Sequence, residues 1–179
     1  PRTYMVGNSM GANIGLWFAA KNPERVTRLA LIAPATSARL MPLPLDRPAW
    51  LSGPASLMLS RPAMAWAHGR TVSNRSLVGK DRIEETFFTY GRQPEAVRSF
   101  LLAIQTIRDA RLIPSLKNFL TPTLILWGSK DRLVHGQVIE GLKAALPKAS
   151  TAIHIGGGHH LQEDEPVWVA GQLTEFFQD

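Results

Sequence analysis

The apolar positions at the start of the chain change their spacing twice. Residues Thr3–Val6 are β-branched or apolar at nearly every position and stop at Gly7, as expected of a strand buried on both faces of a parallel sheet. A helical spacing follows over Met10–Ala20, set by three large apolar residues: Ile14, Trp17 and Phe18. A second apolar run covers Val26–Ala33. The order strand, helix, strand predicts two parallel strands joined by a crossover.

The middle of the chain, residues 36–115, shows no strand pattern. It is rich in proline at first and then becomes helical. Asp81 and Glu84 have the spacing of a helix N-cap signature, and Pro94 stands where a first-turn proline is expected. Apolar residues then recur at a period of about 3.6, namely Val97, Phe100, Leu101, Ile104 and Ile107. We predict a helical cap over residues 36–115.

Strand and helix patterns alternate again after residue 115. The predicted elements are a strand over Pro122–Trp127, a helix over Val138–Leu146, a strand over Thr151–Ile155 and a helix over Pro166–Phe177. Such alternation is typical of an α/β fold with a parallel sheet and flanking helices. The sequence therefore predicts an α/β core formed by residues 1–35 and 116–179, with the helical cap inserted between the two parts.

The composition excludes several classes of protein. With 179 residues, of which 45% are hydrophobic and 19% charged, the chain can form one ordered globular core. The formal net charge is +6, but the arginines are scattered, so we interpret the charge as a solvated surface and expect no nucleic-acid partner. No apolar run approaches the roughly 20 residues that span a bilayer. The chain has no cysteine, which excludes disulfides and thiolate chemistry and leaves the compartment open, with the cytoplasm slightly favoured.

The stretch G-N-S-M-G lies between the first predicted strand and the first predicted helix. G-x-S-x-G in that position is typical of a nucleophile elbow, a sharp turn that exposes the serine hydroxyl above the sheet, although it also occurs as a plain glycine-flanked turn. We expect glycine at Gly7 and Gly11 because a side chain there would clash with the strand or the helix. Ser9 is the candidate nucleophile. The amide of Met10, at the helix N-terminus, is the candidate oxyanion donor.

Two further candidates follow later predicted strands. Asp131 comes after P-T-L-I-L-W, within G-S-K-D, and His159 comes after T-A-I-H-I, within G-G-G-H-H. Because the carboxyl ends of parallel strands meet at one edge of a sheet, we expect Ser9, Asp131 and His159 to lie close together there. The chain order Ser, Asp, His is that of a catalytic triad on an α/β sheet.

Each partner also has a plainer interpretation. Asp131 lies in a turn-rich stretch, where aspartate is common for local reasons. His160 stands beside His159 and competes with it for the role of base. We favour His159 because it directly follows the glycine run. The other histidines are expected at the surface or in turns: His68, His135 and His154.

The three residues would act as a unit. A serine hydroxyl is a weak nucleophile until a base removes its proton, and histidine can accept a proton near neutral pH. Asp131 would hold the imidazole of His159 in the correct tautomer and stabilise the imidazolium. This chemistry requires no cofactor and no metal.

With these motifs the chain resembles the α/β-hydrolase superfamily along nearly its whole length. The matching stretches are V-G-N-S-M-G-A, N-P-E-R-V-T-R-L-A-L-I-A-P-A, P-T-L-I-L-W-G-S-K-D-R-L-V and G-G-G-H-H-L-Q-E-D-E-P. Within the superfamily, G-N-S-M-G and R-Q-P-E-A-V-R-S-F-L are most similar to carbon–carbon bond hydrolases that act on meta-cleavage products of aromatic degradation. The stretch H-H-L-Q-E-D-E-P is also similar to haloalkane dehalogenases and epoxide hydrolases, but those enzymes have an aspartate nucleophile where this chain has Ser9.

The resemblance also implies features that this chain lacks. The carbon–carbon hydrolases commonly carry a cap arginine for a substrate carboxylate, whereas residues 84–87 here are Glu, Glu, Thr and Phe. They tend to have tryptophan where this chain has His160. These departures favour a serine hydrolase of small to medium carboxylic esters, with carbon–carbon hydrolysis as the alternative. An apolar acyl pocket is expected from cap residues, namely Met41, Leu43, Leu45, Trp50, Leu57, Met58 and Trp66.

The family's first strands, and a His-Gly loop that supplies a second oxyanion donor, precede the nucleophile, whereas eight residues precede Ser9 here. We therefore expect a fragment, a chain completed by another polypeptide, or a homodimer formed through the exposed strand Thr3–Val6. A second hypothesis is a remnant of the fold that binds a small apolar ligand or a protein without turnover. Cofactor-free perhydrolysis, which uses the same triad, is a third.

Overall fold

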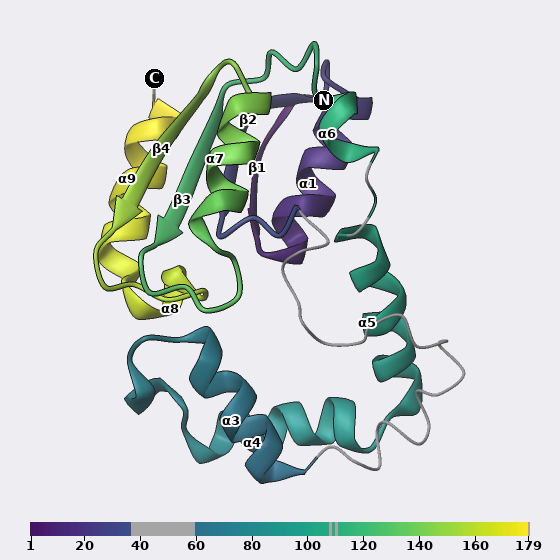
Figure 1. The fold of residues 1–179 in the computed structure, drawn as a ribbon, viewed down its shortest axis with the longest axis vertical. Helices are drawn as coiled ribbons and strands as arrows, with labels where there is room; N and C mark the ends of the chain where they lie inside the picture. The colour runs from purple at the N-terminus through teal and green to yellow at the C-terminus, as the bar shows by residue number, and fades with distance from the viewer. Residues whose placement is uncertain (37–59, 108, 110, 179) are drawn as a thin grey trace.

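A computed structural model of the chain describes residues 1–36, 60–107, 109 and 111–178 (Figure 1). Its described part contains one four-stranded parallel sheet in the order β1-β2-β3-β4. The strands are β1 (Thr3–Asn8), β2 (Val26–Ile32), β3 (Thr123–Gly128) and β4 (Ala149–His154). The predicted α/β fold with a parallel sheet is confirmed, and each predicted strand overlaps an observed one.

Helices cover both faces of the sheet. One hydrophobic cluster joins α1 (Met10–Lys21) and α7 (Gly136–Ala145) to Leu29 and Leu31 of β2. A second cluster joins α8 (Leu161–Asp164) and α9 (Pro166–Gln178) to the intervening residue Ala30 and to Ile32. Successive side chains of a strand point to opposite faces. A strand with a helical layer on each face must therefore be apolar at nearly every position, which explains the continuous run over β2.

The strand β1 departs from the prediction of a fully buried strand. It is the terminal strand of the described sheet, and it pairs with β2 alone. Tyr4 is 52% exposed and Val6 is 50% exposed, while Met5 packs against the core cluster under α1. The ring of Tyr4 stacks on Phe177 of α9, with 4.9 Å between ring centroids. An edge strand with exposed apolar side chains can pair with a further chain.

The helix α1 has nearly the predicted extent, but its fully buried residues are not the ones that set the sequence pattern. Ile14 is 51% exposed, whereas Ala12, Leu16 and Ala19 are fully buried on one side of the helix. Gly15 faces Leu29 of β2 on the same side, where a Cβ atom would lie at an ordinary contact distance of 3.5 Å from Leu29 Cδ1. Of the three large apolar residues that predicted the helix, Trp17 and Phe18 pack against the core cluster as partly buried side chains, and only Ile14 points away from it.

The described residues between 60 and 115 are helical and contain no strand. They form α3 (Arg61–Thr71), the short η3 (Arg75–Leu77), α4 (Lys80–Thr86), the π-helical η4 (Phe87–Gly91), α5 (Pro94–Ile107) and α6 (Leu112–Ser115). Pro94 begins α5 as predicted. The N-cap prediction for Asp81 is wrong, because α4 begins at Lys80 after Gly79 and Asp81 lies within its first turn. The boundaries of the cap, 36 and 115, stay predictions.

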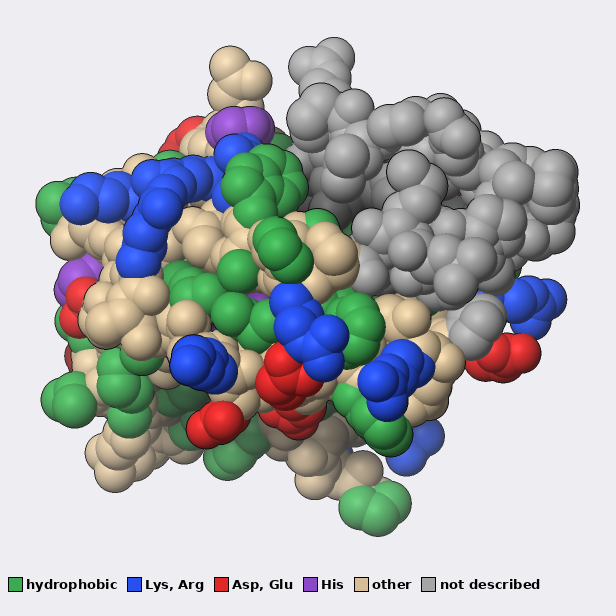
Figure 2. Space-filling view, turned by 90° about the horizontal axis from the view of Figure 1, so that it is seen from below, with side chains coloured by type: hydrophobic (Ala, Val, Ile, Leu, Met, Phe, Trp, Pro, Cys, Tyr) green, Lys and Arg blue, Asp and Glu red, His purple; other side chains and the backbone are tan. Residues whose placement is uncertain are grey.

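Figure 1 shows α3 and α4 below α8 and the carboxyl ends of β3 and β4, with α5 rising beside them toward α1. Seen from that end of the molecule, basic and acidic side chains are scattered over the described surface rather than separated by sign (Figure 2). No helix in the described ranges combines the length and apolar character that crossing a membrane requires.

Candidate active site

Ser9 occupies a sharp turn between β1 and α1. Its φ is 53° and its ψ is −115°, a left-handed backbone that costs a non-glycine residue about 1–3 kcal/mol. Backbone hydrogen bonds hold the turn: Ser9 N donates to Ile32 O at 2.8 Å, and Ser9 O accepts from Ala35 N at 3.2 Å. The turn is therefore fixed by the end of the neighbouring strand β2, as expected of a nucleophile elbow.

The two glycines of G-N-S-M-G differ in what the turn requires of them. A Cβ atom on Gly7 would lie 2.5 Å from Gly11 O and 2.6 Å from Ala12 N, both backbone atoms. A Cβ atom on Gly11 would meet nothing within 4 Å. The expected clash is thus present at Gly7, and the prediction for Gly11 is wrong because that residue sits on the open side of α1.

Asp131 makes contacts that suit both of the roles considered for it. Its Oδ1 accepts hydrogen bonds from Leu133 N at 2.8 Å and Val134 N at 2.9 Å, which is a local turn of the kind aspartate favours. Its Oδ2 lies 2.9 Å from Nδ1 of His159. One carboxylate oxygen therefore fixes the side chain to its own loop, and the other is left for the imidazole.

His159 is 3% exposed and lies on the loop between β4 and α8. Because an ionised carboxylate only accepts hydrogen bonds, Nδ1 of the neutral ring carries the proton and Nε2 keeps its lone pair. This is the tautomer that a general base needs. In the described part of the chain, the neighbouring ring of His160 pairs instead with Glu163, whose Oε1 lies 3.2 Å from His160 Nδ1, and no hydrogen bond joins that ring to Asp131.

Asn8, which the sequence analysis did not single out, links the serine turn to the histidine loop. Its Nδ2 donates to Ile32 O at 3.2 Å and to His159 O at 3.3 Å. The structure thus brings Asp131 and His159 together directly, and Ser9 to the same edge through its neighbour. Among the described residues, no hydrogen bond joins the Ser9 hydroxyl to His159. The only sequence signal for Asn8 was its place within G-N-S-M-G.

Met10 is the first residue of α1. The first amides of a helix have no acceptor within the helix and carry its positive dipole end. The position therefore suits an oxyanion donor, and that role stays a prediction. The Met10 side chain packs against the core cluster shared by α1 and α7.

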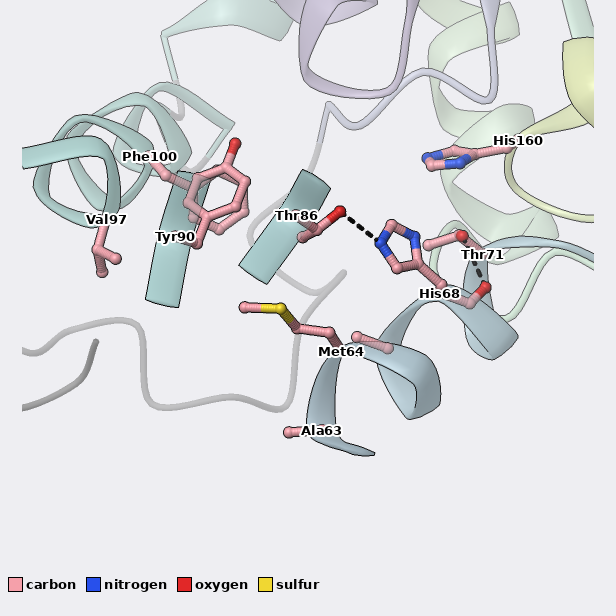
Figure 3. A pocket seen from close by; sticks show the side chains of 10 residues that line it. Ala63, Met64, His68, Thr71, Thr86, Tyr90, Val97, Phe100 and His160 are labelled. Atoms are coloured by element: carbon pink, nitrogen blue, oxygen red, sulfur yellow. Dashed lines mark hydrogen bonds between the residues drawn. The ribbon is translucent and has the colours of Figure 1, made fainter. Parts of the chain in front are cut away.

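A cavity of about 570 Å³ opens between α3, η4, α5 and the residue after His159 (Figure 3). Its lining is mostly apolar: Ala63, Met64, Ala67, His68, Thr71, Thr86, Tyr90, Val97, Phe100 and His160. His160 closes one end, and its ring centroid lies 5.5 Å from that of His159. The cavity therefore adjoins the candidate base.

The cavity corrects two residue predictions. His68, expected at the surface or in a turn, lies on α3 and lines the cavity, with its Nε2 2.8 Å from Thr86 Oγ1. Trp66, expected in the acyl pocket, is 66% exposed and does not line the cavity. The other predicted pocket residues lie outside the described part of the chain: Met41, Leu43, Leu45, Trp50, Leu57 and Met58.

Of the other two histidines, His135 meets the expectation of a surface or turn residue, and His154 does not, because it is a partly buried strand residue. His135 is exposed and precedes α7. His154 is the last residue of β4 and packs edge-on against Trp168, with 5.1 Å between ring centroids.

Arg82 of α4 connects the cap to the core. Its guanidinium pairs with both carboxylate oxygens of Glu163 on α8, and its Nη2 lies 3.5 Å from His160 Nδ1. The hydrogen bonds from Arg82 lower the pKa of Glu163. Burial lowers the pKa of His160, and the neighbouring His159 adds to the effect. The cap therefore carries an arginine near the cavity, two residues before positions 84–87. This arginine is already paired with a carboxylate of the chain itself, that of Glu163.

A profile of the alpha/beta hydrolase family matches residues 1–172 of this chain. The chain belongs to that family. A 2-hydroxy-6-oxononadienedioate/2-hydroxy-6-oxononatrienedioate hydrolase of Paraburkholderia xenovorans (strain LB400) is 27% identical over 167 residues, which cover 90% of this chain and 57% of the relative. The chain therefore spans little more than half the length of that curated relative.

Solved structures share the fold of this alpha/beta hydrolase. A probable hydrolytic enzyme from Pseudomonas aeruginosa PAO1 superposes with a TM-score of 0.81 at 20% identity, over 99% of this chain and 64% of that one. A mutant of the meta-cleavage product hydrolase from Pseudomonas fluorescens IP01 gives a TM-score of 0.78 at 20% identity, over 99% and 65% of the two chains. At this identity the likeness establishes the fold alone.

Proposed function

We propose that this alpha/beta hydrolase is a serine hydrolase that cleaves small to medium carboxylic esters through Ser9, His159 and Asp131. The observation that carries the proposal is the 2.9 Å contact between His159 Nδ1 and Asp131 Oδ2, at the sheet edge where the Ser9 turn also ends. The contact selects the tautomer in which Nε2 can accept a proton. Asn8, hydrogen-bonded to His159 O, keeps the two loops adjacent.

The reaction proceeds by acyl transfer. Ser9 Oγ attacks the ester carbonyl carbon while His159 Nε2 takes the hydroxyl proton, and the Met10 amide stabilises the negative charge that develops on the carbonyl oxygen. The imidazolium returns the proton to the leaving alcohol, which departs and leaves an acyl-enzyme. His159 then activates water, which attacks the acyl group and releases the acid and free Ser9. Asp131 stabilises the imidazolium in both halves.

The cavity beside His160 supports an uncharged acyl group as the substrate's main recognition element. Aliphatic and aromatic side chains form most of its wall, and none of its described lining residues is Lys, Arg, Asp or Glu. The guanidinium of Arg82, which contacts the lining residues His68 and His160, is paired with Glu163. Among the described lining residues, a substrate carboxylate would lose its hydration without gaining a free Lys or Arg cation. These contacts favour neutral esters with apolar acyl chains.

Carbon–carbon hydrolysis is the second candidate, and the relative from Paraburkholderia xenovorans favours it. That protein is named for a dienedioate substrate, which carries two carboxylates. The same triad could serve this reaction if Arg82 exchanged Glu163 for a substrate carboxylate. Steady-state turnover of 2-hydroxy-6-oxononadienedioate that exceeds turnover of any neutral ester would replace the ester proposal with this one.

A third candidate is a remnant of the fold that binds an apolar ligand or another polypeptide without turnover. The exposed apolar side chains Tyr4 and Val6 on the terminal strand β1 favour it, as they favour a homodimer or completion by another chain. Sedimentation of the pure chain, with Val6→Lys as the comparison, tests self-association through this strand. Ligand binding without release of product would support the remnant.

The direct test of the ester proposal is hydrolysis of p-nitrophenyl butyrate by the pure protein. Ser9→Ala should lower kcat by about 10⁴-fold or more, since the nucleophile is removed. Ser115→Ala, a serine of α6 that bonds Leu112 O away from the site, is the control and should leave kcat unchanged. Equal turnover by the wild type and Ser9→Ala would refute the proposal.

A further inference from the structure

Asp164, at the end of α8, gathers three backbone amides from two separate segments. Its Oδ1 accepts from Asn74 N at 3.0 Å, and both of its oxygens accept from Ser73 N at 2.9 and 3.0 Å. Its Oδ2 also accepts from Gly158 N at 2.8 Å. Ser73 and Asn74 follow α3 in the cap, whereas Gly158 belongs to the loop of the α/β core that carries the candidate base.

The place of Gly158 makes this carboxylate relevant to His159. Gly158 directly precedes His159, and a Cβ atom built on it would lie 2.7 Å from Asp164 Oδ2 and 2.8 Å from Ser73 N. On the other side of His159, His160 N donates to Thr71 O at 2.7 Å. The residues flanking the base are thus both fastened to the carboxyl end of α3 or the residues that follow it: Gly158 through Asp164, and His160 directly.

The lowered pKa of Asp164 agrees with an ionised carboxylate that is held by hydrogen bonds. Burial alone would raise its pKa, but hydrogen bonds from Asn74, Ser73 and Gly158 outweigh burial and lower the pKa. Hydrogen bonds from N–H groups to an ionised carboxylate are shorter and stronger than neutral ones. Asp164 therefore stays ionised near neutral pH, and its attachments are stronger than an ordinary loop contact.

We infer that Asp164 is a positioning residue, which fixes the backbone of His159 to the cap so that the imidazole stays aligned with Asp131. The inference rests on the proposed function for the role of His159, but not for the geometry. It gives the cap a second task beside the shaping of the cavity. Thr71, which anchors His160, also lines that cavity. The wall that meets the acyl group and the loop that carries the base are therefore one connected unit.

The variant that tests this is Asp164→Asn. An amide of the same shape offers one acceptor oxygen and turns an NH₂ group toward backbone donors, so the three-way attachment is lost. We expect kcat for p-nitrophenyl butyrate to fall on the order of 10²-fold while KM stays nearly constant, as for a base displaced by about 1 Å. Asp81→Asn, an exposed carboxylate in α4, is the matched control and should change neither constant.

A spectroscopic readout separates positioning from a purely structural role. The proton between His159 Nδ1 and Asp131 Oδ2 should give a low-field proton NMR signal in the wild type and in Asp81→Asn. The signal should broaden or disappear in Asp164→Asn at a temperature where circular dichroism shows the variant fully folded. It requires no turnover, so it tests the positioning inference even if the wild type hydrolyses no ester, which would overturn the proposed function alone.

A second variant keeps the inference testable if Asp164→Asn does not fold. Gly158→Ala places a methyl group between Gly158 and Asp164 and should weaken the same signal, whereas Gly141→Ala, on the open surface of α7, should not. An unchanged low-field signal in a folded Asp164→Asn protein, or in Gly158→Ala, would overturn the inference.

Discussion

Arg82 Nε donates a hydrogen bond to His68 Nδ1 at 3.3 Å, and this contact decides which nitrogen of the His68 ring carries the proton. A guanidinium can only donate, so Nδ1 must be unprotonated. Thr86 Oγ1 gives its own proton to Arg82 O at 2.9 Å. His68 Nε2 is therefore the donor to Thr86 Oγ1 across 2.8 Å. The neutral imidazole is thus built into the wall of the cavity.

This arrangement predicts a loss of stability in mild acid. Burial lowers the pKa of His68, and the charge of Arg82 lowers it further. Burial is also the main cause of the lowered pKa of His160. As the pH falls below the usual 6.5 of histidine, the unfolded chain takes up protons before the folded one does. The stability that depends on these neutral histidines is fully present above that pH and is lost progressively below it. Melting temperatures between pH 8 and pH 5 should show the decline.

His68→Gln provides the comparison for this titration. Its amide can still donate to Thr86 and does not titrate, so the Tm of the variant should depend less on pH than that of the wild type. Identical pH profiles for the two proteins would show that His68 does not contribute.

The ion pair between Arg82 and Glu163 predicts a measurable link between cap and core. Both side chains are less than one-third exposed, and the pair joins α4 to α8. Glu163→Gln should lower the free energy of unfolding by about 1 kcal/mol, the upper end for partly exposed pairs. Glu84→Gln breaks the more exposed pair with Arg61 within the cap and should have little effect. Urea denaturation of the two variants side by side measures the difference, and equal effects would contradict the expected link.

The glycines of the serine turn form a matched pair of tests. Gly7→Ala forces a Cβ atom against the backbone of Gly11 and Ala12 and should destabilise the protein by about 1–3 kcal/mol. Gly11→Ala, with open space around it in α1, should be neutral or stabilising by up to about 1 kcal/mol. Calorimetry that found Gly11→Ala the more damaging change would refute the described turn.

Asp131→Asn separates the catalytic role of Asp131 from its turn. The new Oδ1 can still accept from Leu133 N and Val134 N, but an NH₂ group would face His159 Nδ1. The ring must then accept at Nδ1 and carry its proton on Nε2, the wrong tautomer for a base. We expect kcat to fall about 10³–10⁴-fold with the melting temperature little changed. Unchanged ester hydrolysis would show that Asp131 acts only as a turn residue and has no catalytic role.

The preference of the enzyme for long or short acyl groups should depend on the side chains of the cavity wall. Ala67 of α3 faces the cavity, and Ala67→Leu fills part of it. We expect kcat/KM for p-nitrophenyl octanoate to fall at least about 10-fold relative to the acetate, since each lost methylene contact is worth about 1–3 kcal/mol. Ala144→Leu, exposed on α7, is the control. The same ratio in both variants would mean that the acyl group binds elsewhere.

The sequence predicted the strands and the loop residues well because both depend on local signals. A strand buried on two faces is apolar along its length, as in β2, and residues after parallel strands share one edge, as Asp131 and His159 do. The exposure of β1 depends on what lies beside it in the sheet, so its apolar run predicted burial, and only the family resemblance led to the expectation of an exposed strand over Thr3–Val6.

The contacts that position the site were beyond sequence reasoning for a physical reason. Asp164 is held by the backbone amides of Ser73, Asn74 and Gly158, and any residue except proline can supply such donors. Arg82 meets Glu163 across 81 positions of the chain. His68 reads as an ordinary polar residue of a helix until its helix is placed over the cavity. Three-dimensional proximity, rather than residue type, defines each of them.

The most direct measurement of the central claim is the mass of the intact protein after treatment with a serine-directed alkyl phosphonate, followed by peptide mapping. The account predicts one adduct, located on Ser9, that forms readily near neutral pH and is suppressed in His159→Ala, because the hydroxyl depends on that imidazole for activation. No adduct on Ser9, or an adduct that forms equally fast without His159, would contradict it.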